Sequence, residues 1–334
     1  MIRALVHAST FLLALGLSAW LTPVMREAAL RFGIVDRPDG RLKGHREPVP
    51  YLGGLAIFLS FLLAIAFTLR FRDEVLGMLL AGSIVVILGL VDDLGQIGPW
   101  TKLLGEAVAV MVLVKSGIYI KLTFLPTWAA LPLSVLWLLA ATNAFNLIDI
   151  MDGLSAGTAA VAAAALFAVA VVNGRHESAT LLAGLCGACL GFLRLNLEPA
   201  RIYMGDTGSL LLGLLLGALA MNNGYTENSR IAAVAPGLIL GVPLFDMLFV
   251  MYVRWRRGLP VMLGSPDHVA LRLRKWRLTT RQTVMASYAA TAVLGGAAIG
   301  MKFVGAAGAT AILAGTVLAA LALGWLLRRV DMSL

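Results

Sequence analysis

Apolar segments long enough to cross a lipid bilayer recur along the whole chain, and they restrict its fold more than any other feature. A membrane-crossing helix needs about 20 predominantly apolar residues, because the hydrocarbon core is about 30 Å thick. Eleven segments of about this length can be placed, at residues 4–24, 51–69, 76–91, 102–120, 128–146, 156–173, 179–195, 208–223, 231–251, 284–300 and 303–327. We predict an all-α, polytopic membrane helix bundle of eleven transmembrane helices, or ten, and an odd number places the termini on opposite faces.

The composition agrees with this class, since 60% of the 334 residues are hydrophobic and 13% are charged. The first apolar run is long for a signal peptide and lacks a clear cleavage site, so we interpret it as a membrane helix. Cys186 and Cys189 lie within an apolar run, which favours packing over a redox or metal role. With no soluble domain evident, residues 1–334 are interpreted as a single transmembrane domain.

The distribution of basic residues predicts the orientation of the bundle. Of the 27 Lys and Arg residues, 19 fall in loops on one side and 8 in loops on the other. Cytoplasmic loops carry the excess of Lys and Arg, so the first side is predicted to be cytoplasmic, with the N-terminus outside and the C-terminus inside. The same rule and the attraction of anionic lipids explain much of the net charge of +9 without a nucleic-acid partner.

Five aspartates stand at the ends of apolar runs: Asp92, Asp93, Asp149, Asp152 and Asp206. An acid near the bilayer centre costs about 2.5–3.5 kcal/mol on insertion scales, so such residues are rare unless they have a function. All five fall on the predicted cytoplasmic side, although the count of basic residues did not use them. Adjacent carboxylates such as Asp92 and Asp93 suit a metal ligand beside a base, and a solvated helix end is the simpler alternative.

Four polar residues follow one another at steps of three: Asn143, Asn146, Asp149 and Asp152. Steps of three drift around a helix by about half a turn over this set, so one straight helix could not direct all four side chains at one ligand. We therefore expect the helix to end near Asp149 and the chain to turn back at Gly153. The alternative is an amide-rich contact between helices.

The segment Met204-Gly205-Asp206-Thr207-Gly208-Ser209 is predicted to begin a helix. Thr207 or Ser209 could cap this helix, and its glycines would let backbone N–H groups approach an anion. A phosphate site is therefore one interpretation, and a capped turn without a ligand is the other.

Two basic loops contain further candidates. Lys43 and His45 precede the second span, and His268 and Arg272 lie in a stretch that could form an amphipathic helix at the interface. An ordinary positively charged cytoplasmic loop would also hold such residues. Asp246 lies inside the ninth span, where a structural and a functional role are equally open.

In their order and spacing, these segments resemble the polyprenyl-phosphate N-acetylhexosamine-1-phosphate transferase family (glycosyltransferase 4). The resemblance covers residues 30–285 through Lys43-x-His45 with Pro-x-x-Gly-Gly, then Asp-Asp, Asn-x-x-Asn-x-x-Asp-x-x-Asp-Gly and Met-Gly-Asp-Thr-Gly-Ser. It implies a bacterial inner-membrane protein whose active site faces the cytoplasm. The loops expected to form that site lie near 26–50, 92–102, 147–155, 195–207 and 252–283.

The resemblance also implies a reaction. N-acetylhexosamine-1-phosphate, most simply GlcNAc-1-phosphate, passes from a UDP-sugar to undecaprenyl or another polyprenyl phosphate. The products are polyprenyl-diphospho-sugar and UMP, in the first membrane step of a cell-envelope polysaccharide pathway. The implied cofactor is Mg²⁺, for which Mn²⁺ could substitute. The implied partners are the UDP-N-acetylhexosamine, the polyprenyl phosphate and the bilayer, without nucleic acid, and a homodimer is left open.

Roles carried over by position follow the matching motifs. Asp92 and Asp93 are the implied catalytic residues, with Asp92 as the base, while Asp93 and Asp206 are the implied metal ligands. Tyr203 is expected to stack on uracil. The implied substrate-binding residues are Lys43, His45, Lys102, Asn143, Asn146, Asp149, Asp152, Tyr203, His268 and Arg272.

Two departures from the family pattern affect the expected substrate. Ile150 replaces the first glycine of Asp-Gly-x-Asp-Gly, and the late loop keeps only His268 of several histidines. With the eleventh span, these departures favour a UDP-GlcNAc enzyme over a phospho-N-acetylmuramoyl-pentapeptide transferase. An ion-coupled transporter is the alternative of another class. It would need acids near the midplane in broken helices, whereas five of the acids here end apolar runs on one face.

Overall fold

The computed structural model describes residues 2–36, 48–95, 97–226, 229–260 and 265–332. The described chain is almost entirely helical, with one short two-stranded ribbon. Its elements are α1 (Ile2–Phe32), β1 (Val35–Asp36), β2 (Val49–Pro50), α2 (Gly53–Thr68), α3 (Asp73–Gly95), α4 (Pro99–Lys115), α5 (Thr127–Leu147), α6 (Leu154–Val172), α7 (His176–Asn196), α8 (Gly205–Met221), the 3-10 helix η1 (Arg230–Val234), α9 (Ala235–Ile239), α10 (Gly241–Arg256), α11 (Val269–Lys275), α12 (Thr280–Phe303) and α13 (Ala306–Leu327).

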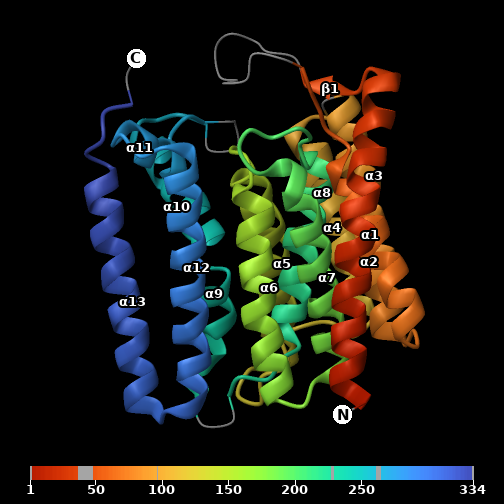
Figure 1. Cartoon of the computed structure of the whole chain (residues 1–334). Coiled ribbons are helices and arrows are strands. Elements are labelled where there is room, and N and C mark those ends of the chain that lie inside the picture. The colour runs from red at the N-terminus through yellow and green to blue at the C-terminus, as the bar shows by residue number, and fades with distance from the viewer. Residues whose placement is uncertain (1, 37–47, 96, 227–228, 261–264, 333–334) are drawn as a thin grey trace.

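The long helices run side by side as one bundle, with the N-terminus and the C-terminus at opposite ends (Figure 1). Within the described residues, seven helices are long and apolar enough to cross a membrane, or eight if a bent pair counts as one span. The all-α membrane bundle is thereby confirmed. The number eleven stays a prediction, because α2 and α8 have only 16 and 17 residues. The orientation also stays a prediction.

The bent pair replaces the predicted straight ninth span. The segment Arg230–Ile239 and helix α10 meet at 79°. Prolines stand in the first turns of α9 and α10, at Pro236 and Pro243. Proline is tolerated there because the N–H groups of the first turn have no partner within the helix, so both residues suit helix starts at the break.

Helix α8 forms the centre of the bundle, in contact with α2, α3, α5 and α6. Every residue from Thr207 to Ala220 is buried. Glycines permit close approach: an added Cβ on Gly54 would lie 2.3 Å from the Gly208 nitrogen, and one on Gly89 would lie 2.4 Å from the Thr207 nitrogen. Small residues at such contacts let helix backbones pack directly in membranes, so the N-terminus of α8 is fixed against both α2 and α3.

Main-chain bonds fix the same region from the ribbon side. Strands β1 and β2 pair antiparallel. The Tyr203 N–H donates to the Pro50 carbonyl at 2.8 Å, and the Gly53 and Gly54 N–H groups donate to the carbonyls of Tyr203 and Met204 at 3.0 and 2.9 Å. The start of α2 and the start of α8 therefore form one unit at the end of the bundle where α3 terminates.

Candidate active site

Lys102 lies at the centre of the polar cluster where α3, α4, α5 and α8 meet. Its Nζ is 3.0 Å from Asp92 Oδ2, donates to Asn146 Oδ1 at 3.1 Å, and also contacts Asp206 Oδ2. The Asn146 amide donates to Asp206 Oδ1 at 2.8 Å. Two carboxylates and one amide oxygen thus converge on a single cation. Charged side chains within a membrane protein usually pair with one another in this way, because an unpaired charge there is costly.

A tight connection brings Asp92 and Lys102 together. The Ile97 N–H donates to Asp92 Oδ1 at 2.8 Å, which closes the turn between α3 and α4. Pro99 then begins α4, and Lys102 stands in the first turn of that helix. Asp92 and Lys102 are therefore brought together by the local chain, while Asp206 comes from α8.

Asp93 faces α8 and caps it. Its Oδ1 accepts from the Asp206 N–H at 2.8 Å, and its Oδ2 accepts from the Thr207 N–H at 3.1 Å and the Thr207 hydroxyl at 2.7 Å. A carboxylate is favoured at a helix N-terminus, where N–H groups lack partners. The prediction that Thr207 or Ser209 caps α8 is wrong, because the acid comes from α3 and Ser209 donates instead to the Gly205 carbonyl.

The glycine of the Met-Gly-Asp segment is required by this contact. Gly205 has a φ of 71°, which favours glycine, and an added Cβ would lie 2.5 Å from Asp93 Oδ2. Any side chain here would be strained and would also displace the capping carboxylate.

The turn after α5 has the predicted form. Helix α5 ends at Leu147, and Gly153 adopts a φ of 76° before α6. Asp152 Oδ2 accepts from the Ala200 N–H at 2.9 Å, and the Gly153 N–H donates to Asn196 Oδ1 at 3.0 Å. The sequence analysis missed Asn196, a buried residue of α7 whose amide also donates to the Ile202 carbonyl.

Asp149 differs from the other acids. Its carboxylate makes no hydrogen bond or ion pair within the described part of the chain. Burial raises its pKa well above the usual range, and the negative charges of Asp206, Asp93 and Asp152 raise it further. Burial also raises the pKa of nearby Tyr203 to about 12, with Asp152 the largest charge acting on it. Both residues thus stand in a strongly negative environment that a cation or a bound ligand would relieve.

Glu106 is a buried acid that the sequence analysis did not single out. It lies one turn beyond Lys102 on α4 and is 1% exposed. Its Oε2 accepts from the Asn143 amide, one turn before Asn146 on α5, and its Oε1 is buried without a partner in the described structure. The pairs Lys102–Asn146 and Glu106–Asn143 therefore connect α4 to α5 on successive turns.

We expect Glu106→Ala to lower the free energy of unfolding by about 1–3 kcal/mol, because one N–H of the part-buried Asn143 amide would lose its acceptor while the other still donates to the Leu139 carbonyl. Glu106→Gln keeps an acceptor oxygen and should remain close to the unsubstituted protein. Thermal unfolding in detergent checks both variants. Equal melting temperatures for Glu106→Ala and the unsubstituted protein would contradict the importance of this pair.

His268 and Arg272 are each paired with protein groups. His268 is 3% exposed, and its Nδ1 lies 2.6 Å from Asp246 Oδ2. Arg272 is 0% exposed and donates to the carbonyls of Leu327 and Val330 at 3.0 and 2.9 Å, and it also pairs with Asp267. Arg272 therefore joins α11 to the end of α13. Its guanidinium N–H groups bond to these carbonyls and to Asp267, which are protein groups and not a ligand.

If that structural role is correct, Arg272→Met should lower the melting temperature and expose the end of α13 to trypsin at Arg328 and Arg329. The expected loss is about 3–5 kcal/mol, because Asp267 would keep a buried charge with one partner removed. Arg328→Gln with Arg329→Gln in the same background should abolish the new cleavage. An unchanged melting temperature with only a raised KM would instead support the predicted substrate contact.

Lys43 and His45, the two remaining predicted site residues, lie outside the described residues. Every other predicted residue has a position. Asp92, Lys102, Asn146 and Asp206 are joined by direct contacts, Asp93 lies against Asp206, and Asn143 is one turn away.

The donors at this site suit a magnesium ion. Mg²⁺ prefers oxygen ligands, and it is usually held by one or two carboxylates together with substrate phosphates. Asp92 and Asp206 with the Asn146 oxygen already gather around one cation, the Lys102 ammonium. Among the described residues, no group of three His, Cys, Asp or Glu side chains is placed to hold a metal ion.

Comparisons with known proteins show similarity over the part of the chain that contains this cluster. Residues 75–223, which contain the cluster, match glycosyl transferase family 4. A probable undecaprenyl-phosphate N-acetylglucosaminyl 1-phosphate transferase of Bacillus subtilis is 32% identical over 86% of this chain and 82% of its own. A decaprenyl-phosphate N-acetylglucosaminephosphotransferase of Mycolicibacterium smegmatis is 29% identical over 85% and 78%.

A phospho-N-acetylmuramoyl-pentapeptide-transferase of Heliobacterium modesticaldum is also similar, with 32% identity over 84% of this chain and 91% of its own. Both branches that the motifs suggested are thus represented among the relatives. The resemblance drawn from the motifs is confirmed, and the chain belongs to glycosyl transferase family 4.

Proposed function

We propose that this chain transfers GlcNAc-1-phosphate from UDP-GlcNAc to undecaprenyl or another polyprenyl phosphate, releasing UMP. The observation that carries this proposal is the cluster of Asp92, Asp206 and Asn146 around Lys102 at one end of the bundle. The names of the Bacillus and Mycolicibacterium relatives support the sugar and the lipid. The excess of basic loop residues supports an inner-membrane protein with this end in the cytoplasm.

The chemistry requires two anions to meet. An oxygen of the lipid phosphate attacks the β-phosphorus of the UDP-sugar, and the bond from that phosphorus to the UMP oxygen breaks. Positioning and charge neutralisation dominate catalysis of this kind. We assign Lys102 to a substrate phosphate, and Asp92 to the proton that a partly protonated lipid phosphate would release. Asp149, whose oxygens are unused in the described structure, is assigned to the sugar nucleotide.

Mg²⁺ would neutralise the diphosphate of the donor when bound, and Mn²⁺ could replace it. We assign Asp206 as its first ligand, because this carboxylate already faces a cation. Asp93 was implied as a second ligand. Its Oδ2 accepts two bonds from α8 and its Oδ1 accepts one, so the second lone pair of Oδ1 is the one that could contribute to the metal while Asp93 holds α8.

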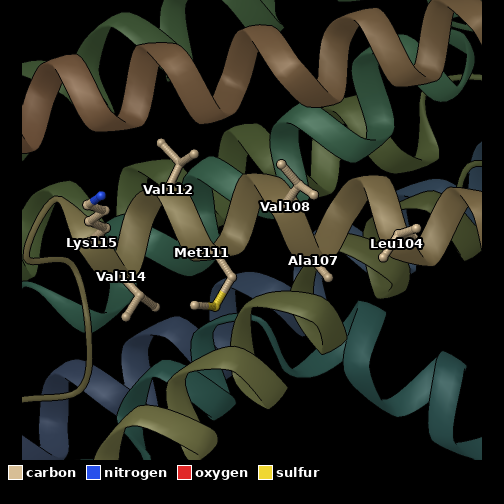
Figure 2. A pocket seen from close by; sticks show the side chains of 7 residues that line it. All are labelled: Leu104, Ala107, Val108, Met111, Val112, Val114 and Lys115. Carbon is tan, nitrogen blue, oxygen red and sulfur yellow. The ribbon is translucent and has the colours of Figure 1, made fainter.

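An apolar groove lies next to the cluster. A groove of about 600 Å³ runs along α4 from Leu104, two residues after Lys102 (Figure 2). Its lining consists of Leu104, Ala107, Val108, Met111, Val112, Val114 and Lys115. Leu104, Val108 and Met111 are more than half exposed. We assign the polyprenyl chain to this groove, which would bring its phosphate to Lys102.

The second candidate within the same chemistry is transfer of phospho-N-acetylmuramoyl-pentapeptide, which the Heliobacterium relative supports. The two functions differ in the donor alone. An ion-coupled transporter finds less support, because the acids cluster at helix ends and around an ammonium.

The test is UMP release by the purified chain in detergent with Mg²⁺, undecaprenyl phosphate and one donor at a time. UDP-GlcNAc should give lipid-dependent UMP that EDTA suppresses, whereas UDP-GalNAc and UDP-MurNAc-pentapeptide should not. UMP from the pentapeptide donor alone would reject GlcNAc in favour of the second candidate. No UMP from any donor would reject the transferase itself.

A further inference from the structure

A second polar pocket lies at the opposite end of the bundle, where α1 and α7 begin and the α2–α3 link turns. Its volume is about 380 Å³, and it is lined by Ile2, Arg3, Val6, His7, Leu69, Arg70, Arg72, His176, Glu177 and Thr180. Asp93 stands 20 residues beyond Asp73, at the other end of α3. At 1.5 Å per residue, about 30 Å separate this pocket from the acidic cluster.

The histidines of this pocket are fixed in defined states. His7 is 9% exposed, and its Nδ1 lies 2.9 Å from the Thr180 hydroxyl. That hydroxyl donates its one hydrogen to the His176 carbonyl at 2.8 Å, so it must accept from His7 Nδ1–H. In the neutral imidazole, His7 Nε2 is thereby left as an acceptor, it makes no hydrogen bond within the described residues, and it belongs to a residue that lines the pocket. The two imidazoles stack at 5.9 Å.

Arg3 fixes the second histidine. Its guanidinium contacts His176 Nε2, and because arginine only donates, that nitrogen must accept. The side chains of Arg70 and Arg72 make no hydrogen bond or ion pair within the described part of the chain. With Glu177 as the pocket's acid, three arginines leave a formal charge of +2.

The position of these arginines is unusual. Only 8 of the 27 basic residues fall on this face, and three of them line one pocket. Basic residues are disfavoured on the face opposite the basic loops. The gathering of three arginines in one pocket there therefore indicates a binding site for an anion. Ile2, Val6 and Leu69 line the same pocket, and Leu5 and Phe67 nearby are 62% and 78% exposed. Such apolar surroundings favour a ligand that also has an acyl chain.

We propose that this pocket binds an anionic phospholipid headgroup that carries a phosphate and hydroxyl groups, such as phosphatidylglycerol. Arg70 and Arg72 bind the phosphate oxygens, a headgroup hydroxyl donates to His7 Nε2, and the first carbons of the acyl chains contact Ile2, Val6 and Leu69. Basic residues near a membrane surface attract anionic lipid by about 1 kcal/mol each, and convergence on one headgroup adds selectivity. The pocket is independent of the transferase proposed above.

The experiment is native mass spectrometry of the full chain in detergent during titration with phosphatidylglycerol or phosphatidylcholine. Phosphatidylglycerol should bind the unsubstituted protein about tenfold more tightly than phosphatidylcholine. The double variant Arg70→Gln/Arg72→Gln should lose this preference. Lys121→Gln, which removes an exposed cation from the same face but not from the pocket, should keep it.

Three outcomes would overturn the proposal. The double variant could retain phosphatidylglycerol like the unsubstituted protein, or Lys121→Gln could lose it equally, which would indicate general surface charge. Inorganic phosphate could also displace the lipid at equal concentration, which would identify free phosphate as the ligand. An unchanged melting temperature shows that each variant is folded. If the chain is a transferase, unchanged UMP release shows the same.

Discussion

Asp206→Asn is expected to reduce turnover about a thousandfold or more while the chain still folds. Asn can keep the hydrogen bond from Asn146, but it removes the negative charge that faces Lys102. Electrostatic groups aimed at a reacting phosphate contribute effects of about this size. The fold should survive, because Asp93 caps α8 through main-chain N–H groups that the substitution keeps. UMP release and the melting temperature are the measurements.

Ser209→Ala provides a matched control for Asp206→Asn. Ser209 lies one turn further along α8 and accepts from the same Asn146 amide at 3.0 Å. Its loss removes one neutral hydrogen bond and no charge, so turnover should stay within about tenfold. If Asp206→Asn kept more than a tenth of the unsubstituted turnover, the assignment of Asp206 to the reaction would be wrong.

Gly89→Ala should disrupt the site through packing alone. The added Cβ would lie 2.4 and 2.5 Å from the Thr207 nitrogen and Cα, and backbone atoms cannot move aside as a flexible side chain can. Helix α3 must therefore shift from α8, which would break the bonds from Asp93 to the start of α8. Overpacking of this kind costs about 1–3 kcal/mol, and turnover should fall more than tenfold.

Gly95→Ala tests whether the effect is specific. Gly95 belongs to the same helix, yet an added Cβ would meet no atom within 4 Å. Its melting temperature and UMP release should equal those of the unsubstituted protein. Similar behaviour of the two alanine variants would contradict the close α3–α8 contact.

The sequence predicted the membrane bundle and much of the acidic cluster, because both depend on strong local signals. Apolar runs indicated the helices. Carboxylates at the ends of these runs are costly in free energy within a membrane, which indicated that they belong to a common functional site. Motif spacing also predicted a helix end near Asp149, two residues after α5 ends at Leu147, and the turn at Gly153.

Pairings between helices could not be predicted in the same way. The cap of α8 comes from Asp93, 112 positions before the Gly205 that begins the helix, and no local pattern encodes that contact. Glu106 resembled an isolated charge in an apolar run until α5 placed Asn143 beside it. Arg272 resembled a loop cation, and its bonds to the end of α13 required the folded chain.

The central claim is that the bond broken in the donor lies between its two phosphates. UDP-GlcNAc labelled with ³²P in the β-phosphate, incubated with the purified chain, Mg²⁺ and undecaprenyl phosphate, tests it directly. The proposed reaction carries the label into the organic phase with the lipid and leaves unlabelled UMP in water. Label that stays in water as UDP, while sugar reaches the lipid, would show transfer of the sugar alone and contradict the proposed reaction.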